Sequence, residues 1–132
     1  MNNENKLNKI TETIIGSSIN IHRELGPGLL ESAYEACLVY DLTKTGLKVE
    51  QQKPLPITYR GIKLDCAYRI DLLVDNLVIV EIKSLDNILP IHKVQLLSYL
   101  RLSDIKLGLL INFNVDVLKD GIVRIVNNFP GA

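Results

Sequence analysis

The sequence predicts an α/β protein in which a central mixed β-sheet is flanked by helices. Three features support this prediction: amphipathic helical segments near the N-terminus, several apolar strand-like runs after them, and a helical segment between two of these runs. A helix that connects two strands of one sheet is a crossover, and crossovers cover the faces of a sheet. With 132 residues the chain is long enough to bury a core, and we expect residues 1–132 to form one domain.

The first two elements are expected to be helices. Within residues 7–25, one narrow arc at about 100° per residue contains Ile10, Ile14, Ile21 and Leu25. Gly26 and Pro27 end this helix, because glycine suits the position after a helix and proline cannot continue its hydrogen bonds. A second helix is expected over residues 29–45 and stops at Gly46.

Strand-like runs follow the two helices. They are expected at residues 48–51, 55–59, 62–74 and 77–83, with an irregularity near Cys66. Arg60 and Gly61 provide a turn between the second and third runs. Pro54 and Pro56 confine the second run to a sheet edge or a loop, since proline cannot donate to a strand ladder.

The last third of the chain supplies the crossover helix and the remaining strands. Pro90 suits the first turn of a helix that reaches about residue 102. Residues 105–112 form an apolar run typical of a buried strand. A final hairpin is expected to turn at residues 120–121 into a strand over residues 122–126. This order of elements predicts an α/β sandwich around a mixed sheet.

Asp71, Glu81 and Lys83 place charge on two adjacent strands where a core should be apolar. Burying an unpaired ion costs several kcal/mol, and two neighbouring carboxylates repel each other unless a cation lies between them. Lys83 follows Glu81 by two residues and therefore projects from the same face of the strand. The pattern predicts a Mg²⁺ site with a cationic helper, which is chemistry suited to phosphodiester hydrolysis.

This interpretation depends on the turn between the two strands. Asp71 lies opposite Glu81 only if three residues, 75–77, form the loop, and Asn76 is then expected to adopt a positive φ. A strict two-residue turn would place Asp71 opposite Val80 and send the carboxylates to opposite faces. The alternative is an edge hairpin with ordinary exposed charges, but the apolar run around Glu81 favours a central strand.

Glu31 is a third candidate acid. At about 100° per residue it lies within about 20° of Leu38 and Leu42 on the second helix, and within about 60° of Tyr34. A carboxylate on an apolar stripe indicates function more strongly than one on a solvated face. The alternative is a glutamate that simply favours the dipole at a helix N-terminus.

Gln95 and Tyr99 form an i,i+4 pair on the third helix, with His92 one turn before. Their amide and hydroxyl groups could hold a phosphate or position Lys83, although a buried tyrosine with a solvated hydroxyl is also common. His22 lies at the border of the apolar arc of the first helix and is a secondary candidate, because such a histidine is more often structural.

Composition limits the function classes. Fifteen basic residues balance fifteen acidic ones, so any nucleic acid must be held by a local basic patch. No run approaches about 20 uninterrupted apolar residues, so no membrane span is expected, and the N-terminus lacks the apolar core of a signal peptide. Cys37 and Cys66 match no metal spacing and are expected to be buried free thiols of a cytoplasmic protein.

Two sets of residues resemble a known family. Gly28, Glu31 and Tyr34 fit the pattern that names the GxxExxY proteins. A second set resembles the core motifs of the PD-(D/E)XK nuclease superfamily, in its RecB-like branch. It consists of Asp71, Glu81, Ile82, Lys83, Gln95 and Tyr99. The resemblance covers about residues 21–127. Ile70 stands where the motif name has proline, at a position that varies in the superfamily.

The resemblance implies a PD-(D/E)XK nuclease-like (restriction-endonuclease-like) core and a Mg²⁺- or Mn²⁺-dependent nuclease acting on nucleic acid, with DNA favoured over RNA. It implies metal ligation by Asp71, Glu81 and the backbone carbonyl of Ile82, catalysis by Lys83, and completion of the site by Glu31. The supporting or substrate-binding residues would be Gln95, Tyr99, Tyr34 and His22. Small nucleases of this kind often pair, so a homodimer is also suggested.

Two other functions remain open from the sequence. One is a non-catalytic subunit that retains the nuclease fold and binds nucleic acid or protein, which the neutral net charge supports. The other is a purely structural α/β module in which Glu81 and Lys83 form an ion pair. The presence of all four core residues, Glu31, Asp71, Glu81 and Lys83, favours the enzyme.

Overall fold

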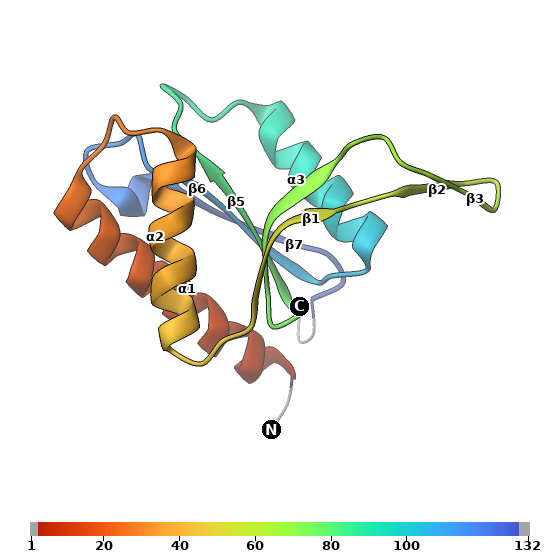
Figure 1. The fold of residues 1–132 in the computed structure, drawn as a ribbon, viewed down its shortest axis with the longest axis horizontal. Coiled ribbons are helices and arrows are strands. Elements are labelled where there is room, and N and C mark those ends of the chain that lie inside the picture. The colour runs from red at the N-terminus through yellow and green to blue at the C-terminus, as the bar shows by residue number, and fades with distance from the viewer. Residues whose placement is uncertain (1–2, 130–132) are drawn as a thin grey trace.

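A mixed five-stranded sheet lies at the centre of the structure, a computed structural model that describes residues 3–129 (Figure 1). The helices are α1 (Asn3–Leu25), α2 (Glu31–Lys44), α3 (Pro90–Ser103) and the 3₁₀ helix η1 (Leu118–Gly121). The strands are β1 (Val49–Pro54), β2 (Ile57–Tyr59), β3 (Ile62–Leu64), β4 (Arg69–Val74), β5 (Val78–Lys83), β6 (Leu107–Asn112) and β7 (Ile122–Val126).

The sheet has the order β1-β4-β5-β6-β7. The β5–β6 pair is parallel, and the other neighbouring pairs are antiparallel. Parallel neighbours need a crossover connection, and α3 provides it between β5 and β6. The α/β fold with a mixed sheet flanked by helices is therefore confirmed.

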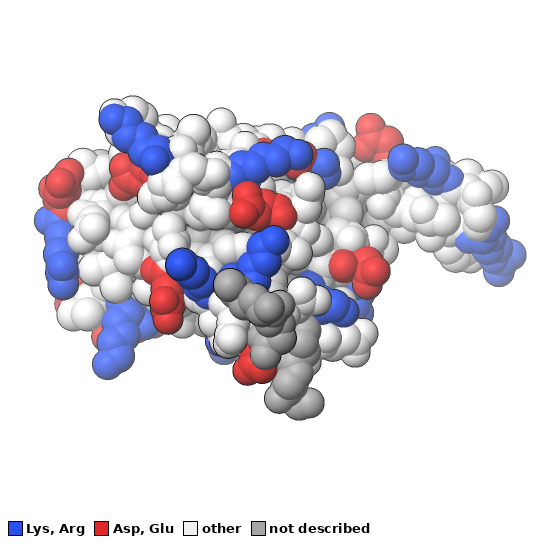
Figure 2. All heavy atoms as spheres, turned by 90° about the horizontal axis from the view of Figure 1, so that it is seen from below, with Lys and Arg blue, Asp and Glu red and all other residues white. Residues whose placement is uncertain are grey.

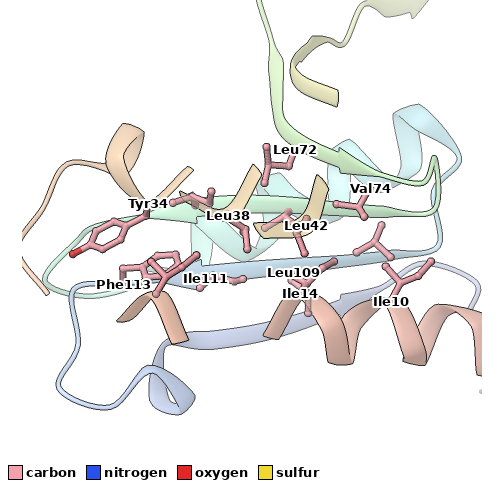
Figure 3. Close-up of a cluster of buried hydrophobic side chains, with 14 of the residues drawn as sticks. Ile10, Ile14, Tyr34, Leu38, Leu42, Leu72, Val74, Leu109, Ile111 and Phe113 are labelled. Atoms are coloured by element: carbon pink, nitrogen blue, oxygen red, sulfur yellow. The ribbon is translucent and has the colours of Figure 1, made fainter. Parts of the chain in front are cut away.

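The two faces of the sheet are covered by different helices. On one face, α1 and α2 bury an aliphatic cluster with two aromatic rings, and Figure 3 labels ten of its members. On the other face, α3 packs Leu96 and Leu100 against Leu73, Ile79 and Leu110. Alternate residues of β5, and of β4 from Leu72 onwards, thus belong to different cores, as the period of two in a strand requires, whereas Ile70 departs from this alternation and lies in the α3 cluster. Asp71 and Glu81 have the parity of Leu73 and Ile79.

The turn between β4 and β5 has the predicted three-residue form. Val74 pairs with Val78, and the register continues through Leu73 with Ile79 and Leu72 with Val80. Asn76 has a φ of 55°, as expected, and Asp75 also lies in the left-handed region with a φ of 53°. Both residue types tolerate this conformation because their short side chains hydrogen-bond locally.

The strand expected over residues 62–74 is interrupted. Residues 65–68 are not part of a strand, and Ala67 has a φ of 62°, so β3 and β4 are separate elements. β3 pairs with β2 in a separate two-stranded hairpin, which projects from the rest of the molecule in Figures 1 and 2. The irregularity expected near Cys66 therefore marks the point where the chain returns to the main sheet. Cys66 is exposed, not buried as predicted, and Cys37 is half-buried.

Other element boundaries differ from the predicted ones by a few residues. α1 begins at Asn3 instead of residue 7, α2 at Glu31 instead of residue 29, and β1 continues to Pro54. The tight turn expected at residues 120–121 is the end of η1, where a Cβ on Gly121 would collide with the backbone carbonyl of Asn112. Within residues 3–129, no helix is both long enough and apolar enough to cross a membrane.

Candidate active site

Asp71 and Glu81 lie where β4 and β5 separate. The ladder between these strands ends at the Leu72–Val80 pair. Beyond it, side chains replace backbone acceptors: the Asp71 N–H donates to Glu81 Oε2 at 2.8 Å, and the Ile82 N–H donates to Asp71 Oδ2 at 2.9 Å. Each carboxylate thus reaches across the gap to the opposite strand. The predicted meeting of these two acids is present in the structure.

Glu81 is buried, with 6% of its surface exposed. Burial raises the pKa of Glu81 to about 8, and the nearby charge of Asp71 raises it further. The hydrogen bond from the Asp71 backbone and the charge of Lys83 act in the opposite direction and do not offset the burial. At neutral pH and without a cation, Glu81 therefore carries a proton, which relieves the repulsion between the two carboxylates.

The backbone carbonyl of Ile82 faces the same gap. Within a strand, the N–H and C=O of one residue point to the same edge. The Lys83 carbonyl accepts from the Phe113 N–H at 2.9 Å and so points towards the β6 side. Ile82 alternates with Lys83, and its N–H donates to Asp71. Its carbonyl is consequently directed to the β4 side, where the carboxylates lie.

Lys83 is half-buried and ends β5. It forms no ion pair within residues 3–129 and acts on Glu81 through its charge, which lowers the pKa of that carboxyl group. The Glu81–Lys83 ion pair of the structural-module interpretation is therefore not formed. The ammonium group remains available for a ligand.

Glu35 is a further acid near the site, and sequence reasoning did not identify it. Gln52 lies opposite Asp71 on β1, between the Gln51–Leu72 and Lys53–Ile70 pairs. Its amide Nε2 donates to Glu35 Oε1 at 3.0 Å and to Asp71 Oδ1 at 3.3 Å. The charge of Glu35 also raises the pKa of Glu81. The signal in the sequence was its i,i+4 spacing from Glu31, which places both acids on one side of α2.

Glu31 is exposed and lies at the end of β5. Its Oε2 accepts from the Ser84 N–H at 3.3 Å, and Ser84 Oγ donates to the Leu29 carbonyl at 2.7 Å. These contacts line a surface hollow together with Gly28, Leu30, Ser32 and Asn114. Among residues 3–129, no group of three or more His, Cys, Asp or Glu side chains is arranged to hold a metal ion. The predicted convergence of Glu31 with Asp71 and Glu81 is therefore not formed in this structure.

Tyr34 stabilises the loop that leads to Glu31. Its hydroxyl donates to the Gly26 carbonyl at 2.6 Å and accepts from the Leu29 N–H at 3.1 Å. Its ring stacks on Phe113 with centroids 4.3 Å apart, as Figure 3 shows. The side chain is fully buried, so these contacts, and no substrate, account for its position.

His22 does not join the carboxylates. It is buried on α1, and its Nε2 lies 2.8 Å from the carbonyl oxygen of Val115. Its ring is 6.5 Å from that of Phe113. These contacts attach α1 to the segment after β6.

Gln95 and Tyr99 are brought to the site by α3. Gln95 Nε2 donates to the Tyr99 hydroxyl at 3.1 Å. Burial raises the pKa of Tyr99, and the charges of Glu81, Tyr68 and Asp71 raise it further. The Tyr99 hydroxyl therefore remains protonated near the two carboxylates and can donate a hydrogen bond.

The donor set suits a small divalent cation. Two carboxylates and one backbone carbonyl supply hard oxygen ligands, which Mg²⁺ and Mn²⁺ prefer. Mg²⁺ keeps several waters and binds through one or two carboxylates together with substrate phosphates, so a third protein carboxylate is not required. Asp71, Glu81 and Ile82 fit such an ion.

Comparison with known proteins finds a family model that matches the chain. A family model described as the PD-(D/E)XK nuclease superfamily matches residues 8–125, nearly the whole chain. The matched segment contains the acids described above and the strands of the central sheet, except for the last residue of β7. No curated protein and no solved structure matches the chain.

Proposed function

Because this chain belongs to the PD-(D/E)XK nuclease superfamily, we propose that it hydrolyses phosphodiester bonds of nucleic acid, with DNA as the favoured substrate. One observation carries the proposal: Asp71 and Glu81 meet in the gap between β4 and β5, and burial there raises the pKa of Glu81 to about 8. A buried acid beside a second, half-buried acid is costly in a protein that has no use for them.

A divalent cation, Mg²⁺ or Mn²⁺, would be held by Asp71, Glu81 and the carbonyl of Ile82. When bound, such an ion polarises a phosphate and lowers the pKa of a water ligand. Glu81 must release its proton to serve as a ligand, so cation affinity rises with pH up to about 8. Gln52 fixes the orientation of Asp71 through the amide contact described above.

The remaining residues act on the substrate. The ammonium group of Lys83 offsets the negative charge that develops on the phosphorus centre during hydrolysis and orients the attacking water. The hydroxyl of Tyr99, held by the Gln95 amide, donates to a phosphate oxygen. Glu31 accepts a hydrogen bond from the N–H of Ser84, the residue after Lys83, and would hold water at this end of β5.

The test is a cleavage assay with labelled duplex DNA, single-stranded DNA and RNA. We expect cleavage with Mg²⁺ or Mn²⁺, none with EDTA, and none with Ca²⁺, which prefers looser coordination by more ligands. Asp71→Asn should abolish cleavage, whereas Asp116→Asn, at an exposed aspartate outside the site, should not change it. Cleavage in EDTA, or full activity of Asp71→Asn, would overturn the proposal.

A non-catalytic nucleic-acid-binding subunit is the second candidate. It is favoured by the lack of an assembled three-acid group within residues 3–129. Under this alternative, the wild-type protein binds the labelled nucleic acids, cleaves none of them with any cation, and binds equally well after Asp71→Asn.

A further inference from the structure

A projecting hairpin next to the site has no role in the proposed chemistry. We define residues 54–68 as the arm; it contains β2, β3 and their flanking residues. Figure 1 shows that it extends away from the sheet and its helices. Its base is held by a hydrogen bond from the Leu55 N–H to the Tyr68 carbonyl at 2.9 Å, and Leu55 is buried. Beyond this base, the β2–β3 hairpin belongs to neither core of the described residues, and an isolated two-stranded hairpin is marginally stable in water, so the arm suits a surface that a ligand covers.

One face of the arm is apolar and exposed. Directly opposed residues of an antiparallel pair project from the same face, and the pairs here are Ile57 with Leu64 and Tyr59 with Ile62. The exposed fractions are 57% for Tyr59, 62% for Ile62 and 42% for Leu64. Contiguous exposed apolar side chains mark a binding surface.

The arm and its base are also basic in a chain of zero net charge. Residues 53–69 contain Lys53, Arg60, Lys63 and Arg69 against a single acid, Asp65. The two basic residues at the base have acidic partners, since Lys53 contacts Glu50 at 2.6 Å and Arg69 contacts Asp65 at 3.9 Å.

Arg60 and Lys63, near the tip, have no acidic partner within residues 3–129. Arg60 lies over the ring of Tyr59, 5.2 Å from its centroid. Figure 2 shows Lys and Arg side chains at the end of the projecting arm. These two cations are therefore available to an anionic ligand.

The arm begins and ends beside the acids. The arm begins two residues after Gln52 on β1, and β4 begins directly after it, two residues before Asp71. The eight steps along the chain from the turn at Gly61 to Arg69 can extend at most roughly 26 Å at about 3.3 Å per residue. This distance corresponds to about seven to eight base pairs at 3.4 Å each. A ligand that follows the arm consequently reaches the gap between β4 and β5.

We propose that the arm lies in the major groove of duplex DNA and holds the duplex across the acidic site. The inference rests on the proposed function. The major groove admits a two-stranded β-ribbon, and its thymine methyl groups accept apolar contacts such as those of Tyr59 and Ile62. Arg60 and Lys63 neutralise phosphates, which offsets the repulsion between DNA and the carboxylates of Glu35 and Asp71. A second copy of the chain would cover the apolar face but leave these two charges unused.

The experiment measures binding of a fluorescent 20-base-pair duplex (about two helical turns) in EDTA, where no cleavage is expected, at several salt concentrations. Arg60→Ala combined with Lys63→Ala should weaken binding about 10- to 100-fold and reduce the slope of log K against log salt by about two. The matched control, Lys9→Ala combined with Lys119→Ala, removes two exposed charges from α1 and η1 and should change neither quantity.

A second pair of substitutions tests the apolar face of the arm. Tyr59→Ser combined with Ile62→Ser should weaken binding without changing the slope of log K against log salt. All variants should keep the wild-type melting temperature, because none of the substituted residues belongs to either core.

Two further measurements distinguish duplex DNA from the other possible occupants of the arm, which are duplex RNA and a second copy of the chain. Duplex RNA of the same sequence should bind at least about tenfold more weakly, because its deep, narrow major groove excludes a β-ribbon. Sedimentation of wild type and Tyr59→Ser/Ile62→Ser reports a second copy on the arm. Loss of a dimer with unchanged DNA affinity would overturn the inference, as would equal effects of the arm and control charge pairs. Absence of duplex binding by wild type would also overturn it, while cleavage of single strands would leave the proposed function standing.

Discussion

Glu81 shows how one side chain connects burial to function. It is buried, faces Asp71, and has a pKa raised to about 8 by its burial and then by the charge of that aspartate. Its carboxyl group is therefore protonated in the folded, cation-free protein and ionised in the unfolded chain over a wide pH range. Proton binding is thus linked to folding at this single position.

The pH dependence of stability tests this linkage. The folded chain holds the Glu81 proton up to pH about 8, whereas the unfolded chain loses it near the ordinary glutamate pKa of 4.5. The stability that protonated Glu81 contributes is complete below pH about 4.5 and is lost as the pH rises towards about 8. The free energy of unfolding of wild type, relative to Glu81→Gln, should fall by up to about 1.4 kcal/mol per pH unit in this window. Urea denaturation in EDTA at several pH values measures the difference, and parallel pH profiles would exclude a raised pKa at Glu81.

Lys83 tests the catalytic role at the same scale. Since it forms no ion pair within residues 3–129, Lys83→Ala should fold with nearly wild-type stability and still bind Mn²⁺. Its cleavage rate should fall by at least about 100-fold, as for the loss of one electrostatic contact in a transition state. Single-turnover kinetics measure the rate, with Lys9→Ala as the control for a lost exposed lysine. An unchanged rate would remove Lys83 from the chemistry.

At the level of elements, the site lies where β4 and β5 stop pairing, beyond the Leu72–Val80 pair. The period of two in a strand and the three-residue turn placed Asp71 opposite Glu81, and both features could be predicted from the sequence. An irregularity near Cys66 could also be predicted, but a complete break at residues 65–68 could not, because Leu64 and Ile70 on either side are compatible with one long, irregular strand. The packing of β4 in the main sheet, and of β3 outside it, decides the break.

The assignment of the helix acid also depends on packing. Glu31 and Glu35 are four residues apart and share one side of α2, so the helical period cannot choose between them. The loop that Tyr34 holds turns Glu31 towards Ser84, while Gln52 on β1 contacts Glu35. These contacts join residues far apart in the sequence and could not be inferred from it.

Gln52 provides a prediction at this scale. Its φ of 48° is costly for a residue that is not glycine, and its amide joins Glu35 to Asp71. Gln52→Gly relieves the strain and removes the amide, so stability should stay within about 1 kcal/mol of wild type while the cleavage rate falls about 10- to 100-fold. Asn128→Gly, at another non-glycine residue with positive φ, should leave the rate unchanged. Equal rates for both variants would show that Gln52 only shapes β1.

At the level of the whole molecule, charge is distributed unevenly in a chain with none overall. Fifteen basic and fifteen acidic residues cancel, yet three acids, Glu35, Asp71 and Glu81, gather beside β4, and the two cations near the tip of the arm have no acidic partner within residues 3–129. In the absence of a cation, the site destabilises the fold that carries it. A ligand that binds only the folded state should then stabilise the whole molecule.

Thermal melting of wild type and Glu81→Gln at pH about 8, with EDTA or with Mn²⁺, tests the central claim most directly. Wild type should gain several degrees in Tm with saturating Mn²⁺, since about 100 times the Kd contributes about 2.7 kcal/mol. Glu81→Gln should be at least as stable as wild type in EDTA, because neutralising the carboxylate removes its repulsion from Asp71, and it should not respond to Mn²⁺. Asp116→Asn should behave as wild type. A wild-type protein indifferent to Mn²⁺, together with a strongly destabilised Glu81→Gln, would contradict a metal-binding pair of acids at this site.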